Sequence, residues 1–387
     1  MTRPISRLGA AGLVLLTTLA TGCGASTGPT SPTGGGGAGG SGAPASAPGP
    51  VAVRAQEAQR VFDAYADANA AADAALDGTA IRAVQTGPLL AESLAEYAIA
   101  RRTGGELPLS GFRRPTFLIP DGRTDQGHPR WFAAVSKWEG RETDRASALH
   151  YFVQREPKGP WRAAVATWVV TAPEPTAPTP PSATRPGFAV PDPDPAVRPP
   201  RDRVRPGTPL LPPPDRAASG TIRTSGTAAA DRAVCDTLAT SLSGTASGPR
   251  SAEAVAADRR FTPGPFTTEL RSYVTGLADD RLRRGYTYRA TDAGLPVFRL
   301  QSGGSLVTCT LTREHRLSGA GNGDTVRFAA GSGTDALLGG GGQAWRRVDE
   351  RSSVTAVVAV PARGTEPATV LSCDCYAPQT LSATGSR

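Results

Sequence analysis

A stretch rich in proline interrupts the chain and constrains every possible fold. Residues 173–214 hold 16 of the 36 prolines, in runs such as "PTPP" and "LLPPP". Proline lacks a backbone donor and fixes φ, so this stretch favours extended polyproline II structure and can reach roughly 130 Å. We therefore predict two folded parts, 51–172 and 218–387, separated by a Pro-rich linker at 173–217. Each part is long enough for one core.

The N-terminus has the pattern of an export signal. Arg3 and Arg7 precede an apolar run, Leu8 to Ala20, that is too short to span a bilayer. The next letters, "TGC", place small residues directly before Cys23, and this pattern resembles the lipobox of bacterial lipoproteins. The resemblance implies a signal peptide at 1–22 and a lipid on Cys23. An ordinary secretory signal is the alternative.

The segment after Cys23 is suited to a tether. Residues 24–50 consist of Gly, Ser, Thr, Pro and Ala, without a charge or a large apolar side chain. Such a segment cannot bury a core, so we expect 23–50 to be disordered, with an end-to-end distance of roughly 30 Å. These features predict a protein anchored by lipid to the cell membrane and facing outside the cytoplasm, with the bilayer as a partner.

The positive charge of the chain is spread along the sequence. The net charge is +8, but the arginines are scattered, and even "RPPRDRVRP" at 198–206 lies in the predicted linker. A nucleic-acid-binding surface gathers its basic residues on one face. We therefore expect no nucleic acid as partner, and retain a cell-wall polymer or another envelope protein. The heavy use of Ala, Gly, Pro and Arg resembles that of high-GC actinobacteria.

The first folded part has the pattern of two helices followed by four strands. An apolar stripe at spacings of three and four, from Ala55 to Leu76, predicts one helix, and 87–102 predicts another. Four strands are expected, at 115–121, 130–138, 147–156 and 161–170. Helices followed by an antiparallel meander predict an α+β fold in which a curled sheet wraps a long helix.

The second folded part is expected to repeat this plan. Helices are expected at 230–242 and 265–285, and strands at 295–301, 305–315, 352–362 and 368–377. The segment "VFDAY" at 61–65 aligns with "VCDTL" at 234–238. This alignment indicates an internal duplication, in which the second copy carries a Gly-rich insertion at 317–345.

This order and number of elements is similar to NTF2-like (cystatin-like cone) domains. Two such domains behind a lipobox resemble actinobacterial lipoproteins of that kind. The resemblance covers both folded parts and rests on the order of elements. It implies no single activity, because the fold hosts enzymes, binding modules and assembly scaffolds.

Enzymes of the family that the chain resembles place an Asp/His or Asp/Tyr pair inside the cone. That resemblance makes Asp63, His150 and Asp236 the candidate polar residues of a cavity, whereas His315 is expected at a wet strand end. A structural role is expected for each histidine, since geometry and a perturbed pKa define a catalytic base. The sequence contains no H-E-x-x-H or P-loop motif, and no catalytic residue is assigned.

Four cysteines fall in the second folded part: Cys235, Cys309, Cys373 and Cys375. An even number outside the cytoplasm predicts two disulfides, and the periodicities place all four in the layer between helix and sheet. Residues i and i+2 of a strand have Cα atoms about 6.6–6.8 Å apart, so a Cys373–Cys375 bond is disfavoured. Cys235 and Cys309 would then each pair with one of the last two. A tetrathiolate zinc or copper(I) site is the alternative, but no metal or cofactor is assigned.

Together these patterns predict a membrane-anchored, non-enzymatic binding or interaction module whose ligand the sequence does not identify. One alternative is a scaffold component of an envelope or secretion-type assembly, similar to the paired NTF2-like domains of conjugation-type machines. Another is an enzyme that uses a cone cavity. A binding module requires an open, mostly apolar pocket, whereas a scaffold requires one dominant protein partner.

Overall fold

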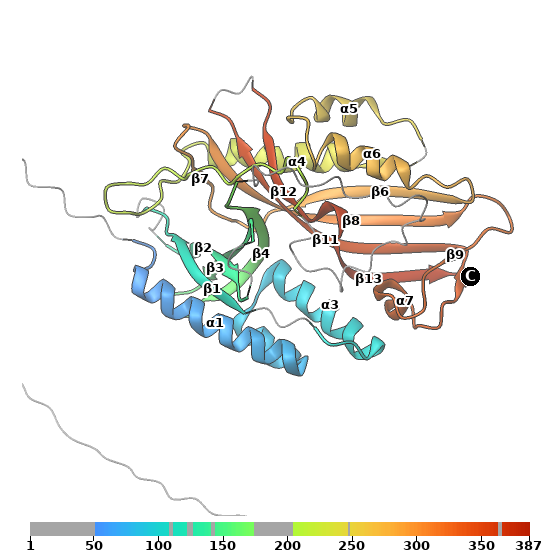
Figure 1. Ribbon diagram of the computed structural model, residues 1–387, viewed down its shortest axis with the longest axis horizontal. Helices are drawn as coiled ribbons and strands as arrows, with labels where there is room; N and C mark the ends of the chain where they lie inside the picture. Colours follow the sequence, from blue (N-terminus) through green and yellow to red (C-terminus); the bar gives the residue numbers. More distant parts are fainter. Residues whose placement is uncertain are drawn as a thin grey trace, which may run out of the picture. The chain divides into compact units, whose positions relative to one another are not determined.

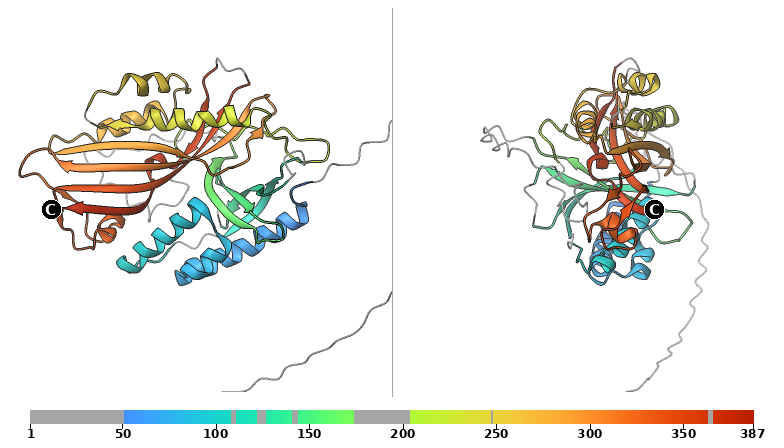
Figure 2. Two further views of the ribbon diagram at one scale, coloured as in Figure 1. Left: turned by 180° about the vertical axis from the view of Figure 1, so that it is seen from behind. Right: turned by 90° about the vertical axis from the view of Figure 1, so that its right-hand side faces the viewer.

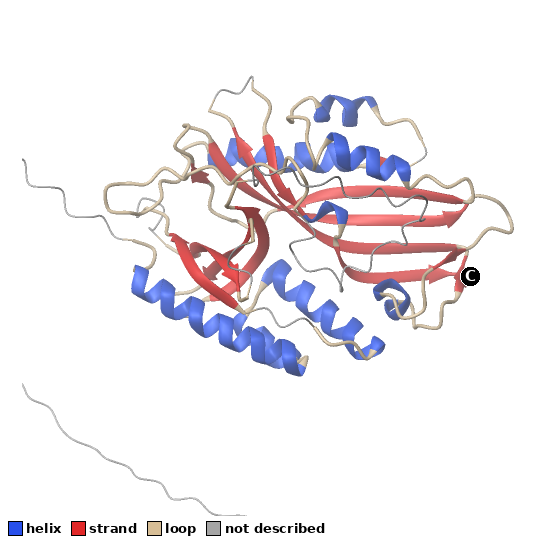
Figure 3. Ribbon diagram, viewed as in Figure 1, coloured by secondary structure: helices blue, strands red, loops and turns tan. Residues whose placement is uncertain are grey.

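The computed structural model describes residues 51–107, 111–121, 127–140, 144–173, 204–246, 248–362 and 366–387. The predicted signal peptide, Cys23, the tether and most of the predicted linker lie outside these ranges. The described part is a mixed α+β structure with curled antiparallel sheets (Figures 1 and 3), so the predicted fold class is confirmed at that level. Within these ranges, no helix is both long and apolar enough to cross a membrane.

Three helices and a four-stranded antiparallel sheet form the first folded part. The helices are α1 (Ala55–Ala75), α2 (Gly78–Val84) and α3 (Gly87–Thr103). The strands are β1 (Phe112–Leu118), β2 (Arg130–Trp138), β3 (Ala146–Gln154) and β4 (Arg162–Val170), adjacent in chain order. The predicted helices and meander are confirmed. The short α2 was not predicted; it is preceded by Asp77, whose carboxylate accepts hydrogen bonds from the backbone amides of Thr79 and Ala80.

The apolar stripe of α1 packs on one face of this sheet. Its buried residues recur at spacings of three and four: Ala58, Phe62, Tyr65, Asn69 and Ala72. The rings of Phe62 and Tyr65 lie 6.2 and 5.3 Å from the ring of Phe152 on β3, measured between centroids. The stripe that the sequence predicted is therefore the surface that holds α1 on the sheet.

The opposite face of the first sheet is also covered. Every residue of β3 is buried, and successive side chains of a strand point to opposite faces. Phe152 packs with α1, whereas Tyr151 and Val153 belong to a second cluster with Phe298 and Val357, from beyond the Pro-rich stretch. The hydroxyl oxygens of Tyr151 and Thr308 lie 2.7 Å apart. Residues from both sides of that stretch thus share one of the hydrophobic clusters of the described residues.

A seven-stranded antiparallel sheet forms the centre of the second folded part. Its strands are β5 (Gly244–Thr245), β6 (Leu282–Thr291), β7 (Phe298–Arg299), β8 (Ser305–Gly319), β11 (Arg347–Val360), β12 (Thr369–Cys373) and β13 (Gln379–Ser386). Its order is β12-β11-β8-β6-β5, with β13 also paired to β11 and β7 to β8. The helices are α4 (Ala228–Leu242), α5 (Ala252–Asp258) and α6 (Thr268–Gly276). Figure 2 shows them on the side of the strands opposite to α1 and α3.

This sheet differs from the predicted repeat of the first. The predicted helix 265–285 ends with α6, and the chain then forms β6, in which Tyr286 and Tyr288 are buried while Thr287 between them is exposed. The predicted strand 295–301 is reduced to the two residues of β7, and the additional strand β13 follows β12. The second part is therefore α+β, as predicted, but with a larger sheet than the expected meander.

The Gly-rich insertion is folded. It forms β9 (Val326–Arg327), α7 (Gly333–Leu337) and β10 (Ala344–Trp345), and β9 pairs with β10. The four glycines at 339–342 all have positive φ, which disfavours residues with a side chain, and they carry the chain back from α7. Arg102 on α3 donates a hydrogen bond to the carbonyl of Ala336 in α7 at 3.0 Å. The insertion is thus held next to α3.

Two disulfides form, but not with the predicted pairing. Cys235 on α4 is bonded to Cys309 on β8, and Cys373 is bonded to Cys375. The prediction that disfavoured the second pair was wrong because it assumed an extended strand. β12 ends at Cys373, and a 3₁₀ turn, η4 (Asp374–Tyr376), brings the two Cα atoms to 5.1 Å. All four cysteines lie in the cluster between helices and sheet, as predicted.

Candidate functional site

The three polar residues predicted for a cavity lie in three different environments. Asp63 is exposed on α1, where it accepts a hydrogen bond from Gln59 at 2.8 Å. Asp236 is exposed on α4, at the edge of a pocket of about 400 Å³ beside the Cys235–Cys309 disulfide. His150 is buried in the first sheet. The structure therefore does not bring these residues together.

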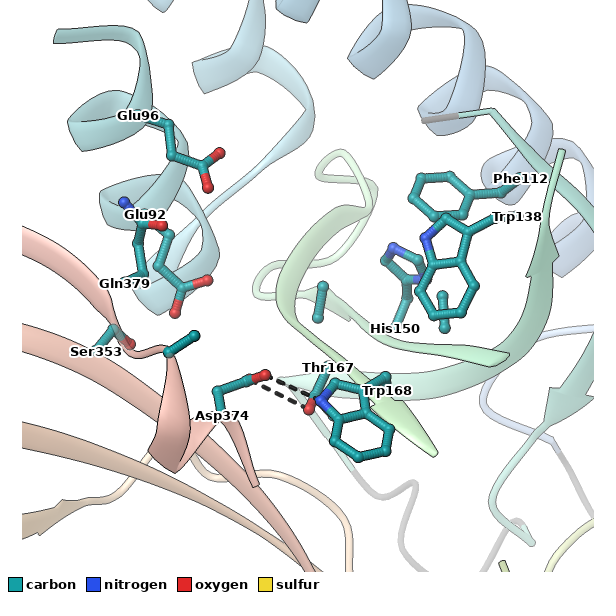
Figure 4. Close-up of a pocket in the computed structure, with 13 residues that line it drawn as sticks. Glu92, Glu96, Phe112, Trp138, His150, Thr167, Trp168, Ser353, Asp374 and Gln379 are labelled. Atoms are coloured by element: carbon teal, nitrogen blue, oxygen red, sulfur yellow. Dashed lines mark hydrogen bonds between the residues drawn. The ribbon is translucent and has the colours of Figure 1, made fainter. Parts of the chain in front are cut away.

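His150 lines a small pocket of about 160 Å³ between α3, the first sheet and the segment that follows β12 (Figure 4). Its ring lies 4.5 Å from the ring of Phe112 and 5.5 Å from that of Tyr65. Burial lowers the pKa of His150 from 6.5 to about 4, so the ring is neutral at neutral pH. Its Nδ1 has no hydrogen-bond partner among the described residues.

A larger pocket of about 440 Å³ lies between α3, the insertion and the second sheet. Apolar side chains from each of these elements line it, including Ile99, Leu107, Leu277, Leu317 and Phe328. Glu96, Ala377 and Gln379 line both pockets, so the two adjoin. A volume of this size with mostly apolar walls is typical of sites for small molecules.

The register of the second sheet places the polar residues of the larger pocket in rows. Tyr286 on β6, His315 on β8 and Glu350 on β11 lie directly opposite one another. Tyr288 and Arg313 pair in the next row on the same face. Because residues two apart along a strand share a face, both rows point into the pocket, which all five side chains line.

Glu350 is at the centre of the first row. His315 Nδ1 lies 2.7 Å from one of its carboxylate oxygens, and the hydroxyl of Thr334 donates to the other at 2.6 Å. Burial raises the pKa of Glu350, but the hydrogen bond and charge of His315 and the charge of Arg313 outweigh it, so that the pKa lies below its ordinary value. Glu350 is therefore ionised at neutral pH, with both oxygens engaged.

The prediction that His315 lies at a wet strand end was wrong. β8 continues to Gly319, and only 3% of His315 is exposed. The ring stacks on Tyr286, with centroids 4.5 Å apart and planes 9° from parallel. The histidine is thus part of the pocket floor.

Arg313 places a positive charge on this floor. Its Nε is buried without a hydrogen-bond partner among the described residues, while a terminal nitrogen donates to the hydroxyl of Ser352 at 3.2 Å. Within the described ranges, no carboxylate forms an ion pair with Arg313. Arg316, which points to the other face of β8, does pair with Asp349, at 3.0 Å. The pocket therefore combines apolar walls with a guanidinium that forms no ion pair with a carboxylate of the described residues.

The described residues contain no group of three or more His, Cys, Asp and Glu side chains arranged to hold a metal ion. The His315–Glu350 pair has a hydroxyl beside it, that of Thr334, and this hydroxyl donates to Glu350. The arrangement can bind and orient a ligand. It does not form a nucleophile activated by a base.

Comparison with known proteins covers the first folded part. Residues 50–189 are similar to a domain of unknown function, DUF8094, a match that includes His150 but ends before the second sheet. No curated protein and no solved structure matches the chain. The floor of the larger pocket therefore lies outside the matched region.

Proposed function

We propose that this chain is a lipid-anchored, extracytoplasmic binding protein whose larger pocket holds a small amphipathic molecule with an anionic group. The lipobox pattern at Cys23 and the tether after it support the anchor. The pocket supports binding, since its volume of about 440 Å³ and its apolar walls suit the body of such a molecule.

The positive charge of Arg313 on the pocket floor is the observation on which the anionic group depends. Among the described residues no carboxylate forms an ion pair with Arg313, and a carboxylate or phosphate oxygen in the pocket could form a charge-assisted hydrogen bond with its guanidinium. Glu350 does not supply this bond, because His315 and Thr334 already engage its oxygens.

The two folded parts are, in this proposal, NTF2-like domains that have diverged after duplication. Support comes from the helices and four-stranded meander of the first part. In the second, α4 packs along its sheet in a position that follows from the alignment of "VCDTL" with "VFDAY" in α1. Additional strands enlarge this sheet, and the insertion supplies one wall of the pocket.

Binding of decanoate and of decanol, measured by isothermal titration calorimetry, tests the pocket. Both chains are apolar, but only decanoate carries a negative charge. We expect wild-type protein to prefer decanoate and Arg313→Gln to bind it about tenfold more weakly, while binding of decanol changes little. Arg316→Gln, on the opposite face, should retain the preference. Equal binding of the two probes by wild type would contradict the proposal.

Fractionation of host cells tests the anchor. Wild-type protein should be found with the membrane and incorporate a labelled fatty acid. Cys23→Ala should lose the label and appear in the medium or in a soluble fraction. A membrane-bound, unlabelled wild-type protein would contradict lipidation at Cys23.

A further inference from the structure

The pocket beside the Cys235–Cys309 disulfide lies between α4, the end of β6 and the start of β8. No described residue lines both this pocket and either of the other two. α4 packs along both strands (Figure 1), and the disulfide joins the helix to β8. Its volume of about 400 Å³ is in the range of sites for small molecules. The pocket is thus a separate space with walls that a covalent bond holds together.

Small aliphatic side chains form much of the lining of this pocket. They come from α4, from the loop after β6 and from β8, and include Ala233, Ala293, Leu295, Pro296, Val297 and Val307. Leu295, Val297 and Val307 are buried. A surface of this kind attracts an aliphatic group of a ligand, because contact with it removes apolar area from water.

The hydroxyl groups of the described lining are already engaged within the protein. The hydroxyl of Thr291 donates a hydrogen bond to the carbonyl of Thr310 at 3.0 Å, and the hydroxyl of Thr310 donates to the carbonyl of Thr291 at 2.7 Å. The hydroxyl of Thr308 lies 2.7 Å from that of Tyr151. The polar side chains that a ligand meets in this pocket are therefore the charged ones.

Arg232 and Asp236 place opposite charges on one face of α4. Residues four apart on a helix have Cβ atoms about 5–6 Å apart, but long helical side chains lean toward the N-terminus, so that of Arg232 leans away from Asp236. A terminal nitrogen of Arg232 donates instead to the carbonyl of Leu295 at 2.7 Å. Among the described residues, Asp236 has no hydrogen-bond or ion-pair partner. The two charges thus line the same pocket without forming an ion pair.

Asp292 adds a second carboxylate from the loop after β6. One of its oxygens accepts a hydrogen bond from the backbone amide of Gly294 at 2.7 Å, which fixes the side chain. The other oxygen has no partner within the part of the chain that the structure describes. The charged lining therefore consists of one guanidinium and two carboxylates.

We infer that this pocket binds a free α-amino acid with an aliphatic side chain. Such a molecule carries a carboxylate and an ammonium group on one carbon. The guanidinium of Arg232 pairs with the carboxylate, while Asp236 and Asp292 accept hydrogen bonds from the ammonium group. The aliphatic side chain lies on the apolar lining. The site shares no residue with the pocket of Arg313 and stands whether or not that pocket binds an anion.

Three probes with the same aliphatic side chain test the two charges separately. Leucine has both charges, leucinamide has only the ammonium group, and N-acetylleucine has only the carboxylate. Binding of each to the mature protein is measured by isothermal titration calorimetry. We expect saturable binding of leucine, and binding of the other two at least about tenfold weaker, because each leaves one charge of the pocket unpaired.

Two aspartates provide matched variants. Asp236 and Asp63 are both exposed on a helix and align in "VCDTL" and "VFDAY", but only Asp236 lines the pocket. Asp236→Asn should weaken leucine binding about tenfold, and Asp63→Asn should leave it unchanged. Arg232→Gln should also weaken it about tenfold, whereas Arg313→Gln, in the other pocket, should not.

Thermal unfolding of each variant shows that it is folded. The test does not depend on Arg232→Gln alone, since Asp236 is exposed and its replacement breaks no contact with a described residue. No saturable binding of leucine, equal affinity for leucine and either of the other probes, or equal effects of Asp236→Asn and Asp63→Asn would overturn the inference.

Discussion

The Nδ1 atom of His315 and a carboxylate oxygen of Glu350 lie 2.7 Å apart on neighbouring strands, and both side chains are almost completely buried. Thr334 from the insertion donates to the second oxygen of Glu350. The pair therefore joins the sheet to the insertion that covers it. With Thr334, His315 engages both oxygens of Glu350, the carboxylate whose pKa the charge of Arg313 also lowers.

Replacement of Glu350 should lower the free energy of unfolding at neutral pH. It should also reduce the loss of that free energy as the pH falls. The folded-state pKa of Glu350 lies below the ordinary 4.5, so its contribution to stability is complete above that pH and is lost as the pH falls through the folded pKa. Glu350→Gln should cost about 1–3 kcal/mol at neutral pH, because it removes a charged partner from His315. Urea unfolding of both proteins at neutral and acidic pH measures this. If the free energies of unfolding of wild type and Glu350→Gln changed with pH in parallel, Glu350 would not be the cause of the loss of stability in acid.

His150 should make the free energy of unfolding depend on pH in a different window. Burial lowers its folded-state pKa from 6.5 to about 4, so the unfolded chain binds the proton more readily. The free energy of unfolding carries no penalty from His150 above about pH 6.5. It decreases by about 3 kcal/mol as the pH falls to about 4 and the unfolded chain takes up the proton. His150→Leu should remove this part of the slope. An unchanged slope in the variant would show that His150 is already protonated or exposed.

The two disulfides should contribute unequally to stability. Cys235–Cys309 closes a loop of 74 residues between α4 and β8, whereas Cys373–Cys375 spans a separation of only 2. In the chain-entropy model the larger loop stabilises more, so Cys235→Ser/Cys309→Ser should cost about 2–4 kcal/mol and Cys373→Ser/Cys375→Ser clearly less. Thermal unfolding of the two double variants makes the comparison. Non-reducing peptide maps that join Cys235 to Cys373 or Cys375 would contradict the pairing itself.

Tyr151 and Thr308 should be energetically coupled although the Pro-rich stretch lies between them in sequence. Their hydroxyls are 2.7 Å apart in the cluster that both folded parts share. A double-mutant cycle with Tyr151→Phe and Thr308→Val should give a coupling energy of about 1 kcal/mol, measured from urea unfolding. Additive effects, together with two separate unfolding transitions, would indicate that the two parts fold independently.

The first folded part was predictable because its elements follow clear periodicities. The stripe from Ala58 to Ala72 repeats at helical spacing, and the hairpin of β3 and β4 is bounded by turn residues. That both faces of β3 are buried was harder to predict. The run "ALHYFVQ" has apolar residues on both faces, which is typical of a strand covered on both sides, and the second cover is the sheet beyond the Pro-rich stretch.

The second part was harder to predict because the charged residues of β6 did not indicate a strand. The segment 282–291 is rich in arginine, and its first four residues, 282–285, were assigned to the end of the predicted helix 265–285. Its alternation of buried Tyr286 and Tyr288 with exposed neighbours has the period of two that indicates a strand. This error hid the floor of the larger pocket, since β6 supplies one side of it.

The residues of the candidate site could not have been grouped from sequence. Arg313, Glu350 and Thr334 have no common motif and meet only through the register of β8 and β11 and the folding of the insertion. For His315 the sequence predicted a solvent-exposed strand end, because Arg313, Glu314 and Arg316 lie beside it in the sequence. The available signal was that His315 and Leu317 alternate with the charged residues Glu314 and Arg316, which is the period of two of a strand.

Native mass spectrometry of the mature protein, purified without organic solvent, shows whether the larger pocket holds an anion. We expect wild type and Arg316→Gln to retain a small anionic molecule, which dissociates at higher collision energy. We expect Arg313→Gln, folded and with both disulfides intact, to be recovered without it. Wild type that carries no ligand and does not take up decanoate, or an Arg313→Gln protein that retains the same molecule, would contradict the claim that this pocket binds an anion through Arg313.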